Sequence, residues 1–168
     1  MNIESVILNL LSTVSKLSIT DSIFNGSSIY VASKLNLIKL DYTISHNSLH
    51  DVESNNNNYI FFVNNYDELS SINIANNIIS NGAIVCGNHS KLSITFTNNT
   101  ISNVKSCISY AYSDEVKKND KFVVAFENNI FTNVDRLYYN TVVRHHHSKL
   151  HSNNTYNNCG EELTRYIE

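Results

Sequence analysis

The residues most able to do chemistry gather in one stretch of this chain, between Asp135 and His151. That stretch holds two arginines, one lysine and four histidines: Arg136, Arg144, His145, His146, His147, Lys149 and His151. Guanidinium and ammonium groups bind anions, and imidazoles can bind metals or move protons. The stretch is therefore one of two unusual places where chemistry could lie, the other being the excursion from Tyr110 to Asp120.

The histidine run does not predict a metal centre. Consecutive side chains of a strand point to opposite faces, so only His145 and His147 share one. Two histidines without a nearby acid or cysteine make a weak zinc site. We interpret the run as a polar loop and expect no metal there. Two further polar clusters are also interpreted as loop or solvated turn: His46, His50 and Asp51, and the excursion from Tyr110 to Asp120.

Composition limits the partners and the class of protein. The chain has 168 residues, 12 Lys and Arg against 15 Asp and Glu, and a net charge of −3. The sequence has no cluster of basic residues, so it does not predict a nucleic-acid surface. It also has no run of 18 apolar residues, so it does not predict a membrane span. The three cysteines, Cys86, Cys107 and Cys159, form no CxxC pair, so a disulfide framework is not predicted, although one bridge remains open.

Asparagine dominates the polar residues, and it occurs in a repeat. The chain has 28 Asn and 22 Ser, four Gly and no Pro. Six segments share an alternating apolar strand, a polar corner and a second short strand. The corners with two asparagines are at Asn76-Asn77, Asn98-Asn99, Asn128-Asn129 and Asn153-Asn154. Asn tolerates the left-handed backbone that a tight corner requires, and stacked Asn side chains can hydrogen-bond to one another.

This repeat predicts an all-β fold, a right-handed parallel β-helix with Asn-rich corners. Strands recurring every 20 to 30 residues or so without intervening helices are typical of such solenoids. Residues 1–168 would form one domain, with 1–14 as a cap or short helix and 148–168 as the last coil and C-terminal cap. The expected inward side chains are Leu92, Ile94, Phe96, Phe126 and Phe131. A leucine-rich-repeat solenoid is the alternative fold, and low complexity is the alternative account of tracts such as Asn55–Asn58.

The stretch from Lys105 to Asn158 resembles the pectate lyase family, whose fold is a right-handed parallel β-helix. A strand and Asn corner, Leu92–Val104, lead to Lys105, and Tyr112-Ser113-Asp114 follows. Val124–Val134 then matches most of the family's next strand motif. The remaining elements are paired arginines, Arg136 and Arg144, and the string Asn153-Asn154-Thr155-Tyr156. The matching region is about half of the chain, residues 70–160.

The resemblance implies β-elimination on an acidic polysaccharide such as pectate. Carried over, Arg136 is the candidate base, and Arg144 and Lys105 bind the acidic sugar or orient the site. His145, His147 and Tyr139 are the candidate substrate-binding residues. The family's calcium cofactor is also implied, yet the corresponding positions, Ile74-Ala75-Asn76 and Asn81–Val85, carry no carboxylate. Arg136 and Arg144 are also eight residues apart where the family has five.

Two functions from different classes therefore stay open. The first is a polysaccharide lyase, secreted and monomeric by resemblance, although no signal peptide is visible at the N-terminus. The second is a non-catalytic β-helix that binds a glycan or serves as a structural surface module. The preserved Lys and Arg residues favour the first, and the missing carboxylates favour the second.

Overall fold

The computed structural model describes ten segments of the chain, and every regular element in them is a strand. The segments are residues 2–4, 7–10, 16–25, 28–31, 41–50, 70–81, 91–104, 106–109, 121–139 and 147–160. The strands are β1 (Asn2–Glu4), β2 (Ile7–Leu10), β3 (Lys16–Thr20), β4 (Ile23–Asn25), β5 (Ser28–Val31), β6 (Asp41–Ser45), β7 (Ser48–His50), β8 (Ser70–Ala75), β9 (Ile78–Ser80), β10 (Lys91–Thr97), β11 (Thr100–Ser102), β12 (Ser106–Ser109), β13 (Lys121–Glu127), β14 (Ile130–Thr132), β15 (Arg136–Tyr139), β16 (His147–Ser152) and β17 (Thr155–Asn157).

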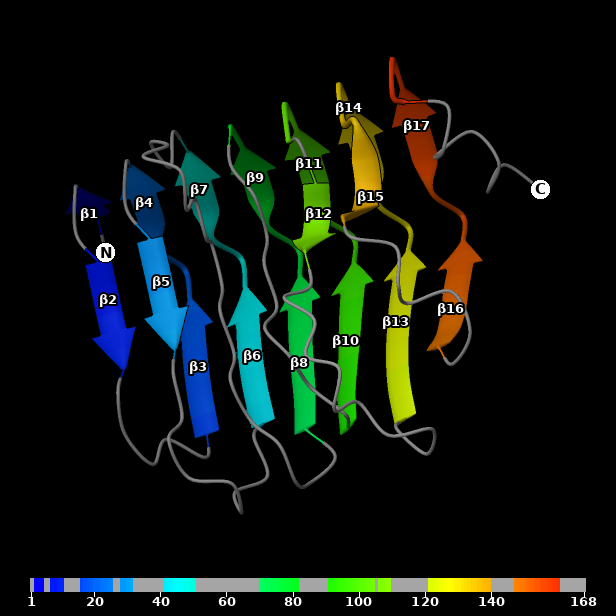
Figure 1. Cartoon of the computed structure of the whole chain (residues 1–168). Coiled ribbons are helices and arrows are strands. Elements are labelled where there is room, and N and C mark those ends of the chain that lie inside the picture. Colours follow the sequence, from blue (N-terminus) through cyan, green and yellow to red (C-terminus); the bar gives the residue numbers. More distant parts are fainter. Residues whose placement is uncertain are drawn as a thin grey trace.

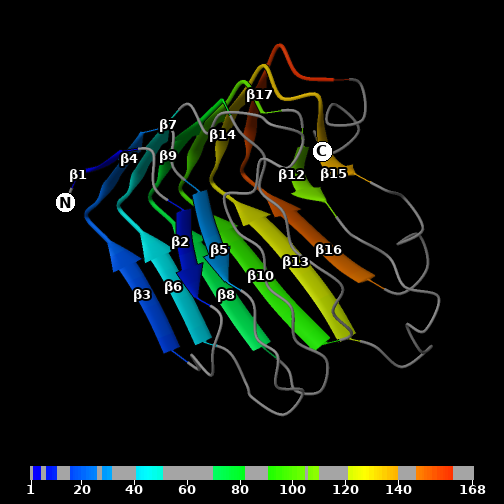
Figure 2. The same cartoon turned by 60° about the vertical axis from the view of Figure 1, so that its left-hand side comes forward.

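These strands form two large parallel sheets and two small ones. The short strands make a seven-stranded sheet in the order β1-β4-β7-β9-β11-β14-β17, and the long strands make a six-stranded sheet in the order β16-β13-β10-β8-β6-β3. Strands β12 and β15 pair, as do β2 and β5. Figure 1 shows that each sheet follows chain order from one end to the other, and Figure 2 shows the sheets at an angle to one another. The arrangement is consistent with a parallel β-helix, as predicted.

The core lies where the strands alternate between apolar and polar side chains. Ile94, Phe96, Phe126 and Phe131 are fully buried, as the sequence predicts. The side chain of Leu92 lies outside the description. Aromatic rings stack across neighbouring strands, with 4.7 Å between the ring centroids of Phe96 and Phe126. Such register-matched stacking ties each strand to the next one along the sheet.

Each long strand joins its short strand through a two-residue corner. The first corner residue has positive φ in six successive repeats: Asp21, His46, Asn76, Asn98, Asn128 and Asn153. Asp, His and Asn are the residue types other than Gly that adopt this backbone most readily. The corner of a repeat therefore needs a left-handed residue but not a glycine, which explains a chain with few glycines.

The second corner residue points inward and builds a buried ladder of amides. Asn47, Asn77, Asn99 and Asn129 are all at most 3% exposed. Asn77 donates from its backbone N–H and from Nδ2 to Asn99 Oδ1, at 2.9 and 3.0 Å. Asn99 donates in the same way to Asn129 Oδ1, at 2.9 and 3.0 Å. The predicted stacking of corner asparagines is thus confirmed.

The structure corrects two predictions of local structure. The prediction of a helix within residues 1–14 is wrong, because Asn2–Glu4 and Ile7–Leu10 are strands paired in parallel with β4 and β5. The prediction of a loop at His50 is also wrong, whereas His46 does lie in the bend between β6 and β7. His46 is a corner residue and His50 ends strand β7, because the position of His46 repeats that of the Asn corners. Asp51 and Asn55–Asn58 lie outside the described residues.

Candidate functional site

Three of the six residues predicted for the site lie within the described structure. Arg136 and Tyr139 belong to strand β15, and His147 begins strand β16. The predictions of Lys105, Arg144 and His145 fall outside the described residues, as does the excursion 110–120. The prediction of a polar loop is wrong for His147 and His151, because both lie in strand β16.

Strand β15 carries both Arg136 and Tyr139. Leu137 is buried at 2% exposed, whereas Arg136 is half-buried. Because side chains alternate along a strand, Arg136 belongs to the outer face. Arg136 pairs in register with Ser106, and Tyr139 with Ser109. The two residues therefore share strand β15, and the side chain of Tyr139 lies outside the described part of the structure.

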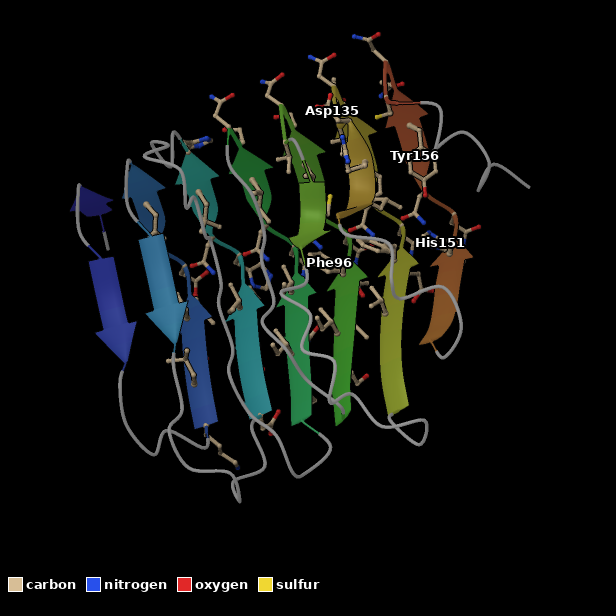
Figure 3. The ribbon with its side chains drawn as sticks, in the orientation of Figure 1. Phe96, Asp135, His151 and Tyr156 are labelled. Carbon is tan, nitrogen blue, oxygen red and sulfur yellow. The ribbon has the colours of Figure 1, made fainter. Side chains whose placement is uncertain are left out.

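Strand β16 brings polar residues into register with an apolar row. His147, Lys149 and His151 pair in register with Phe122, Val124 and Phe126. The ring of His151 stacks on Phe126 with 5.4 Å between centroids, and Tyr156 stacks on Phe131 at 5.1 Å. Figure 3 shows His151 and Tyr156 in this last pair of strands. The ring of His151 thus continues the aromatic stack of the core.

The seven-stranded sheet carries a regular outer surface that sequence reasoning missed. Its first row is Ile23, Ser48, Ile78, Thr100, Ile130 and Thr155, and its second row is His50, Ser80, Ser102, Thr132 and Asn157. We call these two rows the outer strip. Its side chains are half-buried or exposed, whereas the residues between the rows, such as Phe24 and Leu49, are buried. The signal was available, because the residue after each of the four corner Asn pairs is Ile or Thr.

The outer strip is uncharged and partly apolar. None of its named residues is Lys, Arg, Asp or Glu. Its three isoleucines are exposed by 46, 52 and 45% for Ile23, Ile78 and Ile130. Isolated exposed isoleucines are ordinary, but these three recur on alternate strands between hydroxyl residues. The strip therefore offers methyl groups and hydroxyls at a constant repeat.

Exposed amides border the strip at both ends of its short strands. One border is the row of first corner residues, in which Asn76, Asn98, Asn128 and Asn153 are exposed. The other border contains Asn81, Asn103, Asn133 and Asn158, which are also exposed and have positive φ. Asn133 donates from Nδ2 to Asn103 Oδ1 at 2.9 Å, and Asn158 donates to Asn133 Oδ1 at 2.7 Å. These hydrogen bonds hold the second border in one orientation.

The described residues contain no group of three or more His, Cys, Asp or Glu able to hold a metal ion. Cys107 and Cys159 are free thiols, and burial, with a smaller contribution from Cys159, raises the pKa of Cys107 far above its ordinary range. Among the described residues, no helix is long and apolar enough to cross a membrane. A scan against protein-family models and searches of curated proteins and of solved structures found no match for this chain.

Proposed function

We propose that this chain is a right-handed parallel β-helix that binds a neutral polysaccharide along its outer strip without cleaving it. The observation that carries the proposal is the strip itself, a periodic, uncharged surface of methyl and hydroxyl groups bordered by two rows of exposed amides. Solenoid proteins commonly use such extended surfaces for binding.

The chemistry of the strip matches a chain of sugars. A sugar ring presents C–H groups on its faces and hydroxyl groups at its rim. The exposed isoleucines would contact the faces, and the Asn amides, which both donate and accept hydrogen bonds, would contact the rim. Six strands at about 4.8 Å spacing give a strip about 24 Å long. A linear polymer can follow this length and make the same weak contact on successive strands, which adds avidity.

Affinity electrophoresis in gels containing a neutral polysaccharide, such as a glucan or a mannan, tests this proposal. We expect retardation of the native protein, and a loss of at least tenfold in affinity for Ile78→Glu and Ile130→Glu. The matched control is Asn73→Glu, which places the same charge on an exposed residue of the six-stranded sheet. No retardation in any neutral polymer, or equal loss in the control, contradicts the proposal.

A second candidate function, the polysaccharide lyase, is favoured by the position of Arg136. This arginine lies half-buried on the outer face of β15, where its guanidinium can bind a sugar carboxylate with two hydrogen bonds. Asp135, its exposed neighbour, is labelled in Figure 3. In β-elimination, a base removes the proton next to the carboxylate and the 4-linked oxygen leaves. Lys105 and Arg144 would supply the further positive charge that stabilises the intermediate.

Calcium does not fit the residues that correspond to the family's ligands. Ala75 is half-buried on β8, and Asn76 and Asn81 are exposed corner residues that offer only neutral amide oxygens. Calcium sites usually include carboxylates. We therefore derive no step through this ion.

Release of unsaturated uronide from polygalacturonate, followed by its ultraviolet absorbance, tests the lyase candidate. If the candidate is right, Arg136→Ala and Arg144→Ala each abolish the absorbance increase, whereas Lys16→Ala, an exposed lysine of β3, leaves it unchanged. Binding of polygalacturonate without any increase in absorbance would reject the lyase.

A further inference from the structure

Strands β7 and β9 place a serine, a histidine and a second serine in one hydrogen-bonded line. Ser48 Oγ contacts His50 Nε2, and His50 Nδ1 lies 2.7 Å from Ser80 Oγ. Ser48 and His50 are two residues apart on one strand, so they share its outer face. Ser80 belongs to the neighbouring strand β9, whose Ile78 and Ile79 pair with Ser48 and Leu49. All three side chains are half-buried.

This line has the order of a nucleophile, a base and a residue that orients the base. In the tautomer that carries its proton on Nδ1, His50 donates a hydrogen bond from Nδ1–H to Ser80 Oγ. Its Nε2 then has a lone pair that faces the hydroxyl of Ser48. A serine whose hydroxyl donates to such a nitrogen can lose its proton as it attacks a carbonyl. The strip has other hydroxyl pairs on one strand, such as Thr100 and Ser102, but no other histidine.

The surroundings of Ser48 point to the class of substrate. Its register neighbours on β4 and β9 are Ile23 and Ile78, which are 46% and 52% exposed. The hydroxyl thus lies between two accessible apolar side chains. A small apolar acyl group can contact these side chains while its carbonyl carbon faces Ser48 Oγ.

We propose that Ser48 is a nucleophile for short-chain acyl esters, with His50 as its general base and Ser80 as a positioning residue. Ser48 Oγ bonds to the acyl carbon while its proton passes to His50 Nε2. The ester C–O bond then breaks, and His50 returns the proton to the leaving alcohol. Water hydrolyses the acyl-serine by the same route, which releases the carboxylic acid and restores Ser48. These three residues belong to the outer strip, but the inference does not depend on polysaccharide binding, because the covalent step at Ser48 is measured without any polysaccharide.

The test is covalent labelling of the full chain with a fluorophosphonate probe, with the modified residue located by mass spectrometry. A fluorophosphonate reacts at serines activated by a base, and fluoride leaves. We expect modification at Ser48, absence of it in Ser48→Ala, and a rate lower by about a hundredfold in His50→Gln. The matched control is Ser18→Ala, which removes an exposed hydroxyl from β3 in the six-stranded sheet and should leave the rate unchanged.

Two further measurements separate catalysis from a structural role. A burst of nitrophenol from nitrophenyl acetate, equal to one acyl group per chain and located on Ser48, is expected. For Ser80→Ala we expect the ¹⁵N chemical shifts of His50 to indicate a mixture of tautomers, instead of the Nδ1–H tautomer alone. The labelling rate should fall, and the unfolding midpoint should stay the same. Labelling of Ser102 as fast as Ser48, an unchanged rate in His50→Gln, or an Nε2–H tautomer in the native protein would overturn the proposal.

Discussion

Each corner of the fold makes different demands on its two residues. The first residue must adopt a positive φ, between 52° and 57° for Asp21, His46, Asn76, Asn98, Asn128 and Asn153. The second must satisfy buried backbone groups of the neighbouring repeats. Asn99 illustrates this role, because it accepts from Asn77 and donates to Asn129 and to the Ile74 carbonyl at 2.8 Å. The two positions of an Asn pair therefore differ in what a substitution costs.

Replacing Asn99 by alanine should destabilise the protein far more than replacing Asn98 by glycine. Asn99→Ala removes the acceptor of the buried Asn77 backbone N–H and the Nδ2 donor to the Ile74 carbonyl, and a buried polar group that loses its partner costs about 1–3 kcal/mol. We expect a loss of about 3 kcal/mol or more in the free energy of unfolding. Glycine adopts positive φ freely, so Asn98→Gly should change the free energy of unfolding by no more than about 0.5 kcal/mol. Urea denaturation measures both, and equal losses would contradict this division of roles.

Cys107 gives the protein a pH dependence of known sign. Burial raises its pKa in the folded state, with a further contribution from Cys159, so the native thiol stays neutral. In the unfolded chain this thiol ionises above about pH 8.5, and the unfolded state then binds fewer protons. Stability is therefore fully present below that pH and falls above it, by up to about 1.4 kcal/mol per pH unit. Urea midpoints between pH 7 and pH 9.5 check this slope, and Cys107→Ala should remove its share.

At the scale of elements, the last repeat is held by a close backbone contact. Gly160 donates its N–H to the carbonyl of Val134 at 2.9 Å. A Cβ on Gly160 would lie 2.0 Å from the carbonyl oxygen of Asp135, which no side chain tolerates. Only glycine allows the chain after β17 to pass this close to the start of β15.

Gly160→Ala should therefore loosen the last repeat before the rest of the fold. We expect a loss of about 1–3 kcal/mol, as for other overpacking substitutions. Hydrogen exchange should quicken at Thr155, whose N–H donates to the Asn129 carbonyl at 2.8 Å, and much less at Thr100, whose N–H donates to Asn77. The opposite order, with Thr100 affected first, would show that the contact does not act locally.

The sequence predicts those elements whose residue types repeat and fails where another residue takes the same role. The Asn pairs from Asn76 onward locate their corners, and the spacings of 22, 30 and 25 residues reappear in the ladder hydrogen bonds. The corners at Asp21 and His46 escaped notice, because Asp and His also accept positive φ but do not look like Asn in a repeat. The apolar run at residues 6–11 suggested a helix, whereas β2 belongs to a small parallel sheet with β5.

The candidate site was harder to predict than the fold. Charged residues attracted attention in the sequence, yet the face of a strand decides which side chains meet. Arg136, for example, lies half-buried on the outer face of β15, whereas its neighbour Leu137 is buried in the core. Ser48, His50 and Ser80 meet only through the register of β7 with β9, and the spacing of 30 residues between His50 and Ser80 gives no local signal.

At the scale of the whole molecule, the amide ladder joins repeats that each contact only their neighbours. Its rungs run from Ser22, which donates to Asn47 Oδ1 at 3.0 Å, through Asn77, Asn99 and Asn129 to Asn154. In repeat proteins, stability is approximately a sum of terms for each repeat and for each interface. Substitutions in the ladder should therefore be coupled between adjacent rungs and independent between distant ones.

Double-mutant cycles on the ladder measure this directly. Asn99→Ala with Asn129→Ala removes both ends of the Asn99 Nδ2 to Asn129 Oδ1 hydrogen bond of 3.0 Å, so the second substitution should cost less than it does alone. We expect a coupling energy of about 1 kcal/mol or more for this adjacent pair. Asn47 and Asn154 are four rungs apart, about 19 Å, and their alanine variants should add within about 0.5 kcal/mol. Additivity in both pairs would mean that the rungs are independent, and coupling in the distant pair would mean that the ladder transmits free energy through the whole stack of repeats.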